Sequence, residues 1–223
     1  MDKKVSSLPL KDRYVVLTGD LKSSRKLKAL DRAKIQENLK KALTIINRKF
    51  ADIIIAEFII VQGDSFQGMI SSSKYLFDIY YVLFENIAYQ YYLGVGIGNI
   101  STDISKNVGE IDGEAFHKAM KALEQAKKEK EWIKFEGSGE IDGIITYLLN
   151  FMADVMWNWT KRQREIVIHY KKMKSEKVDL TLEEIAKDIG IKKQTISKIL
   201  RRSKYKMIEK AEKGFVDFVS PAK

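Results

Sequence analysis

The sequence predicts an α+β protein in which a ferredoxin-like, or palm-type, antiparallel sheet with helices on one face precedes an all-α helix-turn-helix domain. Two observations lead to this class. In the first 136 residues, short runs of strand-forming residues alternate with segments of helical periodicity, and one hairpin lies among them. In the last 64 residues, only helical patterns and turn residues occur, and most of the excess positive charge is found there.

The composition excludes several classes of protein. No run of about 18 apolar residues occurs, so no segment is expected to span a membrane. The chain contains no cysteine, which excludes disulfides and thiolate metal sites and fits a cytoplasmic protein. With 45% apolar residues, the 223 residues can bury the cores of one medium and one small domain.

Positive charge is concentrated towards the carboxyl-terminal end. Residues 160–223 carry 18 Lys and Arg against 9 Asp and Glu, whereas residues 1–159 carry 22 against 21. The formal net charge of +10 therefore arises almost wholly from the last third of the chain. Such an asymmetry indicates a polyanion-binding end attached to an electrically balanced domain, although a solvated lysine-rich surface would show the same composition.

Residues 12–136 are expected to form the sheet domain. Strands are predicted at residues 14–20, 53–61, 66–71, 92–100 and, at an edge, 131–135, with helices at 31–50, 73–90 and 112–128. The order β-α-β-β-α-β, followed by one further helix and strand, indicates a ferredoxin-like arrangement. Gly94, Gly96 and Gly98 alternate within a strand pattern, which predicts a bare sheet face against which a helix packs closely.

Two aspartates are expected to meet at one edge of this sheet. In the ferredoxin-like arrangement the first and third strands are antiparallel neighbours, so the end of the first strand lies beside the turn that begins the third. Asp20 ends the first strand, and Asp64 lies in that turn. Taken alone, each fits an ordinary turn or cap residue. Together they offer two oxygen ligands with open positions, which suits Mg²⁺ that also holds substrate phosphates.

A nucleotide is the ligand that such an edge would take. Ser23 and Ser24 follow the first strand and offer amides and hydroxyls to phosphate oxygens. Gly63, in the hairpin turn, lets a base or sugar lie close to the backbone. The sequence therefore predicts Asp20 and Asp64 as metal ligands, and Gly63, Ser23 and Ser24 as nucleotide-binding residues.

The segment that begins at Thr181 has the pattern of a helix-turn-helix. Thr181 and Glu184 have the spacing of a capping box, and the apolar residues that follow repeat at helical spacing. Gly190 comes where a left-handed residue must turn the chain, and a second short amphipathic segment follows. Small Ala186 lets the two helices approach closely, which completes the pattern.

The outward positions of the second helix are polar and basic. Its amino-terminal residues are expected to reach base edges in the major groove of double-stranded DNA, with Gln194 able to pair with adenine. Its later cations are expected to meet phosphates. An ordinary helical hairpin with a wet, basic face is the alternative. The predicted DNA-binding residues are Lys193, Gln194, Thr195, Ser197, Lys198, Arg201 and Arg202.

A linker helix over residues 137–159 is predicted to join the sheet domain to the helix-turn-helix domain of residues 160–223. Thr160 and Gln163 mark the start of a helix that supports the hairpin. The last predicted helix, residues 205–218, fits either a packing helix or a dimer contact. Two-fold dimers are common among such binders, so a homodimer is expected from precedent and not from the residues themselves.

Four segments, YVVLTGDLKSSRKL, VQGDSFQGMI, GVGIGNISTDI and DGEAFHKAMKAL, occur in an order and spacing that resembles proteins of the SatD family. The resemblance covers residues 14–202. The amino-terminal half also resembles, more distantly, the palm-type domain of GGDEF diguanylate cyclases and class III nucleotide cyclases, in which two carboxylates bind metals. It implies that Asp64 matches the hairpin ligand and Asp20 the first-strand ligand. The carboxyl-terminal end resembles the DNA-reading region of sigma factors.

The hairpin departs from the GGDEF pattern, because Ser65 stands in place of the glutamate and Gln62 precedes the glycine. The resemblance therefore implies nucleotide or Mg²⁺ binding rather than efficient cyclic dinucleotide synthesis. Three functions stay open: a DNA-binding transcriptional regulator whose palm-like domain senses a nucleotide or Mg²⁺, a nucleotide cyclase or nucleotidyltransferase tethered to DNA, and a structural DNA-binding dimer with a degenerate palm. We favour the first.

Overall fold

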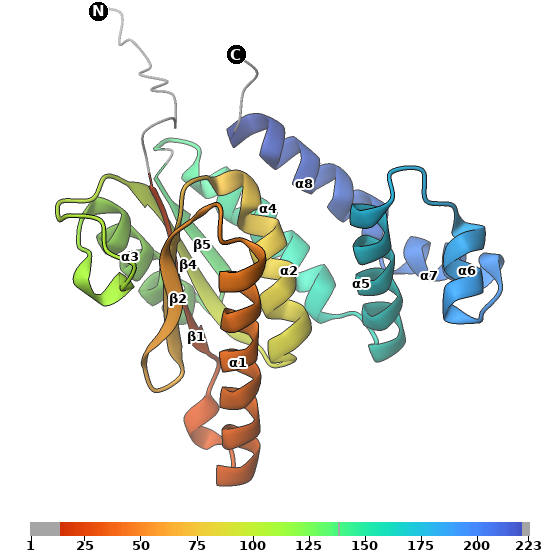
Figure 1. The fold of residues 1–223 in the computed structure, drawn as a ribbon, viewed down its shortest axis with the longest axis horizontal. Coiled ribbons are helices and arrows are strands. Elements are labelled where there is room, and N and C mark those ends of the chain that lie inside the picture. The colour runs from red at the N-terminus through yellow and green to blue at the C-terminus, as the bar shows by residue number, and fades with distance from the viewer. Residues whose placement is uncertain (1–13, 138, 220–223) are drawn as a thin grey trace, which may run out of the picture.

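The computed structural model describes residues 14–137 and 139–219, apart from the side chain of Arg25, so the predicted domain limits at residues 12 and 223 lie outside the described residues. The strands form one sheet in the order β2-β3-β1-β4-β5 (Figure 1). They are β1 (Tyr14–Leu21), β2 (Ile54–Gln62), β3 (Ser65–Ile70), β4 (Tyr91–Gly98) and β5 (Ile133–Glu136). The first four pair antiparallel, as predicted, but β5 runs parallel to β4, so the sheet is mixed.

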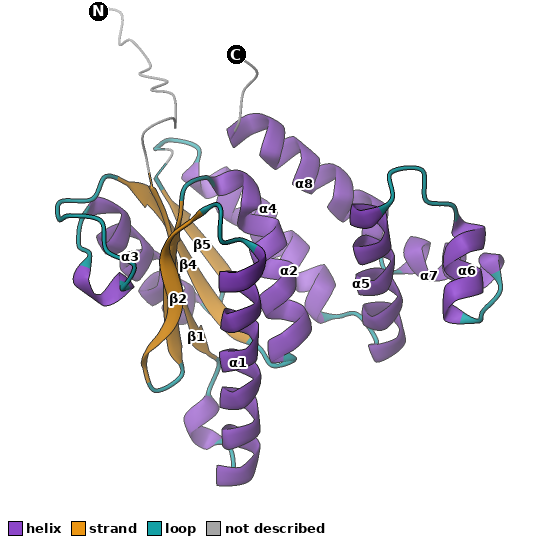
Figure 2. Ribbon diagram, viewed as in Figure 1, coloured by secondary structure: helices purple, strands orange, loops and turns teal. Residues whose placement is uncertain are grey.

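Eight α-helices accompany the sheet within the described residues (Figure 2). They are α1 (Ala29–Lys49), α2 (Leu76–Ile87), α3 (Glu114–Glu129), α4 (Asp142–Trp157), α5 (Lys161–Glu176), α6 (Leu182–Ile189), α7 (Lys193–Arg202) and α8 (Tyr205–Val219). Three short 3₁₀ turns, η2 (Ser24–Lys26), η3 (Ser73–Tyr75) and η4 (Val108–Glu110), lie in the connections. No helix among the described residues is long and apolar enough to cross a membrane.

Helices cover both faces of the sheet, which corrects the predicted single helical face (Figure 1). One face packs against α1, α2 and α4, while α3 packs on the other over β1, β4 and β5. The reason lies in β4, whose eight residues are all buried. A strand that is buried on both sides needs a covering layer on each, and the extra helix α3 supplies the second layer.

The glycines of β4 allow α3 to lie directly on the sheet, as the alternating pattern predicted. A Cβ atom added at Gly94 would lie 2.2 Å from the carbonyl oxygen of Ala119, and one added at Gly96 would lie 2.2 Å from that of Ala115. The neighbouring residues of β4, such as Val95, face the opposite core. The close approach therefore depends on glycine at these positions, because the contacting atoms belong to the helix backbone.

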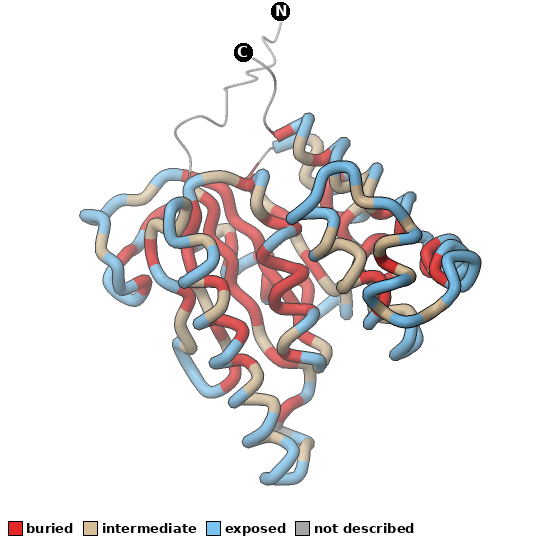
Figure 3. Tube along the Cα trace, turned by 45° about the vertical axis from the view of Figure 1, so that its right-hand side comes forward, coloured by how far each residue is buried: buried red, intermediate tan, exposed pale blue. Residues whose placement is uncertain are grey.

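One continuous apolar core joins the sheet to the carboxyl-terminal helices. Figure 3 shows buried residues in both the sheet and these helices. Helix α4, predicted as a linker, packs on β5, and Asn150 accepts a hydrogen bond from the amide of Trp132 (2.7 Å) and donates one to the carbonyl of Ile133 (2.6 Å). Helix α8 returns to the sheet domain, where the Phe215 ring lies 5.3 Å from that of Phe77. The proposed domain boundaries at residues 137 and 160 are thus crossed by shared packing.

Replacing Gly96 by alanine should destabilise the protein. The new methyl group meets the α3 backbone, so the helix must move away from β4, and we expect a loss of about 1–3 kcal/mol in the free energy of unfolding. Urea denaturation measures this loss. Gly214→Ala on α8 is the control: nothing lies within 4 Å of its added Cβ, and helix propensity should stabilise it by about 1 kcal/mol. A Gly96→Ala protein as stable as the parent would contradict the packing.

Candidate functional site

The helices α5 and α6 begin at two capping boxes, both of which were predicted. At α5, the Thr160 hydroxyl accepts from the amide of Gln163 (3.2 Å) and the Gln163 side chain accepts from the amide of Thr160 (2.9 Å). At α6, the corresponding bonds between Thr181 and Glu184 measure 3.3 and 2.9 Å. Each box satisfies two amides that a helix start leaves without partners, so the sequence fixes where these helices begin.

The chain turns between α6 and α7 at Gly190, which adopts a left-handed conformation with φ of 72°. The turn is closed by a hydrogen bond from the amide of Ile191 to the carbonyl of Ala186 (3.0 Å). Ile185 of α6 and Ile196 of α7 are buried against the supporting helix α5 and its neighbours. The apolar sides of the two helices therefore face inward, and the polar side of α7 faces solvent.

All seven predicted DNA-binding residues of α7 are exposed. Lys193 is the one whose charge is engaged, because its ammonium group contacts the carboxylate of Glu183 on α6. Among the described residues, Lys198, Arg201 and Arg202 make no ion pair. The second half of α7 therefore presents three uncompensated positive charges to solvent.

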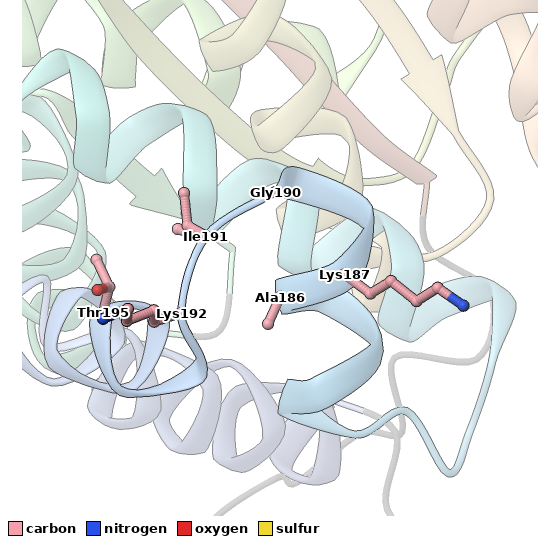
Figure 4. A pocket seen from close by; sticks show the side chains of 6 residues that line it. All are labelled: Ala186, Lys187, Gly190, Ile191, Lys192 and Thr195. Carbon is pink, nitrogen blue, oxygen red and sulfur yellow. The ribbon is translucent and has the colours of Figure 1, made fainter.

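A shallow concavity of about 560 Å³ opens between α6 and α7 beside the turn (Figure 4). Its lining includes Lys187, which extends outward from α6 in this view, together with Lys192 and Thr195 on the other side. Lys192 is the N-cap residue of α7 and its side chain makes no capping hydrogen bond. Two lysines thus lie at the edge of one hollow beside the start of α7, where positive charge attracts anions. Neither lysine was among the predicted site residues, although their positions beside Gly190 could have indicated them.

A second group of predicted residues lies at the end of the sheet where β1 and the β2–β3 hairpin meet. Asp20 lies opposite Ser65 in the β1–β3 register, which confirms that these strands are antiparallel neighbours. The Ser65 hydroxyl donates a hydrogen bond to Oδ1 of Asp20 (2.5 Å), and Nζ of Lys127, on α3, lies 2.7 Å from Oδ2. Both oxygens of Asp20 therefore already have partners, one of them a cation that sequence reasoning missed.

Asp64 lies in the hairpin turn beside Asp20 but has a different cation. Its side chain is buried, and Nη2 of Arg32, on α1, lies 3.9 Å from Oδ1. Gly63 has a left-handed φ of 61°, and its carbonyl accepts a hydrogen bond from Gln36 (3.4 Å). The structure thus brings the two carboxylates to the same end of the sheet. Asp20 contacts a cation of α3 on one face, and Asp64 contacts a cation of α1 on the other.

The predicted phosphate-binding serines follow β1 at the same end of the sheet. Ser23 is exposed and left-handed, with φ of 54°, whereas Ser24 is buried at the start of η2. On the α3 side, Nζ of Lys22 lies 4.5 Å from the centre of the Trp132 ring, which stacks against Tyr92. No group of three or more side chains within the described residues is arranged to hold a metal ion. The rim therefore offers two aspartates, but not a complete protein cage.

The fold and these two surfaces define an α+β protein with a basic helical end and an acidic rim that carries its own counter-cations. Residues 14–218 match the SatD family, and the chain belongs to this family. No curated protein matches the chain. Among solved structures, a similar chain is titled "Structure of a bacterial light-regulated adenylyl cyclase"; it is 11% identical, with 55% of this chain and 74% of that chain covered and a TM-score of 0.41.

The capping box of α6 should make the stability of this protein depend on acid pH. A contact with the Lys177 ammonium and hydrogen bonds from Thr181 lower the pKa of Glu184 from 4.5 to about 2. The folded state therefore resists protonation, and its stability is complete above about pH 4.5 and falls as the pH drops towards 2.

Urea denaturation across this pH range should show a shallower pH dependence for Glu184→Gln, because the glutamine side chain can still cap the helix but cannot titrate. Glu124→Gln, at an exposed position of α3, is the matched control and should keep the slope of the parent. Equal slopes for the parent and Glu184→Gln would show that this carboxylate contributes nothing.

Proposed function

We propose that this protein is a DNA-binding transcriptional regulator that holds double-stranded DNA through α7. The observation that carries the proposal is the exposure of every outward residue of α7, directly after a glycine turn and within a segment of net charge +9. Helix α7 has 10 residues and is about 15 Å long. A helix with its side chains is about 10–12 Å across, which fits a major groove about 12 Å wide.

The order of residues along α7 supports a division of contacts. Gln194, Thr195 and Ser197 lie near its amino-terminal end, which is the part of a recognition helix that reads base edges. Arg201 and Arg202 lie in its last turn and suit phosphates. At the amino-terminal end of α7, its uncapped amides would meet a second stretch of the DNA backbone. Lys187 and Lys192, which lie beside this end, would meet the same stretch.

The charges in the second half of α7 are not compensated within the described residues. Several lysines elsewhere in the chain lie against carboxylates, for example Lys118 against Glu114 (2.7 Å) and Lys171 against Glu212 (2.8 Å). The cations in the second half of α7 have no such partners among the described residues. Phosphates would supply the missing negative charge, and their binding would release counterions.

The rim of the palm-like domain is our second candidate site, for a nucleotide with Mg²⁺. It is favoured by the juxtaposition of Asp20 with the hairpin that carries Asp64. Their counter-cations Lys127 and Arg32 lie on opposite faces of the sheet and are 40% and 38% exposed, so either side chain can turn to ligand phosphates while the carboxylate that it leaves takes the metal. Under this proposal the domain senses a nucleotide, and the tethered cyclase or nucleotidyltransferase is the alternative.

Replacing both Arg201 and Arg202 by alanine should weaken DNA binding for every sequence. Because each lost phosphate contact removes about one unit from the log–log salt slope, the double variant should lose about two units. Fluorescence anisotropy on a mixed-sequence duplex at about 50–200 mM salt measures this slope. Lys210→Ala with Lys213→Ala, on exposed α8 positions, is the control with equal charge loss and should keep the slope.

Gln194→Ala provides the complementary variant for the same surface. It should keep the salt slope but change the preferred site when binders are selected from random DNA, because it removes a base contact worth about 1–3 kcal/mol. An unchanged slope in the double arginine variant would remove α7 from the phosphate contacts, and an unchanged selected site would show that Gln194 reads no base.

Asp64→Asn should weaken Mg²⁺-dependent nucleotide binding at least tenfold, or by about 1.4 kcal/mol, since the amide offers no negative charge to the metal. Calorimetry with a nucleoside triphosphate, with and without Mg²⁺, measures this loss. Asp52→Asn is the control, at an exposed position after α1. Binding of equal strength by Asp64→Asn and the parent would end the nucleotide proposal without affecting the DNA proposal.

A further inference from the structure

Helix α4 carries an apolar stripe on its outer face. Ile144, Tyr147 and Phe151 are 70%, 62% and 76% exposed, and their spacing places them on one side of the helix. The opposite side, which includes Leu149 and Met152, is buried against the sheet. A helix that is apolar on both sides is expected to be covered on both sides.

The area of this stripe is large for the free surface of a monomer. With about 150–250 Å² for a whole aromatic side chain, the exposed parts of the three residues amount to roughly 400 Å². Apolar patches of about 300–600 Å² on soluble proteins often have a function. The half-buried side chains of Leu148 and Val155 flank the stripe and extend it.

We infer that this face joins two copies of the chain, with α4 packed against its symmetry mate across a two-fold axis near Tyr147. Two stripes would bury about 800 Å² in total, about half of a standard interface of about 1,600 Å², so we expect a weak, concentration-dependent dimer. The same apolar stripe on each copy is self-complementary, as an isologous contact requires.

Cations do not oppose a second copy at this position. Two chains with a formal net charge of +10 repel each other. Helix α4 contains neither lysine nor arginine, so a contact between two α4 helices brings no cations of α4 together. The nearest charges in sequence are acidic: Asp142 at the start of α4, which accepts a hydrogen bond from the amide of Gly137 (2.9 Å), and Glu140 and Asp154, each seven residues from Tyr147. Helices that cross at about 50° diverge towards their ends, which separates these carboxylates between the two copies.

The inference does not depend on DNA binding and is tested without DNA. Sedimentation equilibrium should show a concentration-dependent dimer for the parent, and Phe151→Glu should weaken it at least tenfold because a carboxylate would be buried without a partner. Val178→Glu is the matched control, since Val178 is 92% exposed in the α5–α6 connection and belongs to no apolar stripe. Circular dichroism checks that both variants are folded.

Cross-linking locates the contact directly. Since the chain contains no cysteine, Tyr147→Cys introduces a unique thiol, and a short bis-maleimide should join two copies through it, whereas Val178→Cys should give little product. A parent that stays monomeric up to about 100 μM would indicate that another partner covers the stripe and would overturn the inference. Equal dimerisation of Phe151→Glu and the parent, or equal cross-linking at residues 147 and 178, would overturn it too.

Discussion

The burial of most of the surface of α2 constrains the arrangement of the whole molecule. Nine of its twelve residues are buried, between the sheet with α1 on one side and the carboxyl-terminal helices on the other. The Arg164 guanidinium carbon of α5 lies 3.9 Å from the centre of the Phe84 ring, and Nζ of Lys171 lies 3.8 Å from that of Tyr81. Only the face with Asp78 and Glu85 is exposed, and α5 and α8 cannot leave the rest of α2 without exposing these rings to water.

This packing fixes the direction in which α7 points. The Trp159 indole, buried between α4 and α5, donates a hydrogen bond to the carbonyl of Ser203 (2.8 Å), directly after α7. The segment from α5 to α7, residues 161–202, is therefore held against the sheet domain at both ends. Trp159 holds its start, and α8 holds its end. Under the proposed function, a recognition helix held in this way would lose less conformational freedom on binding than one carried by a flexible linker, so more of its contact energy would remain as affinity.

The features that the sequence predicted depend on residues close together in the chain or on the order of strands. The two capping boxes, the turn at Gly190, the glycine face of β4 and the pairing of β1 with β3 are of this kind. The second helical layer, the contact of Lys127 with Asp20 and the return of Phe215 to the sheet arise from long-range packing. No local pattern distinguishes Lys127 from the lysine beside it, because the partner of each is decided by the register of α3 on the sheet.

The distribution of charge links the two proposed interfaces. If the excess cations were spread over the whole surface, an apolar stripe of about 400 Å² could not overcome the repulsion between two copies. Because they are concentrated after residue 160, they would leave α4 free to associate and would be neutralised by bound phosphates. In the proposed arrangement a weak α4 contact is sufficient, since two α7 helices on one duplex raise the effective concentration of the second binding event. Linkage then requires that DNA strengthen the dimer by the same factor by which dimerisation strengthens DNA binding.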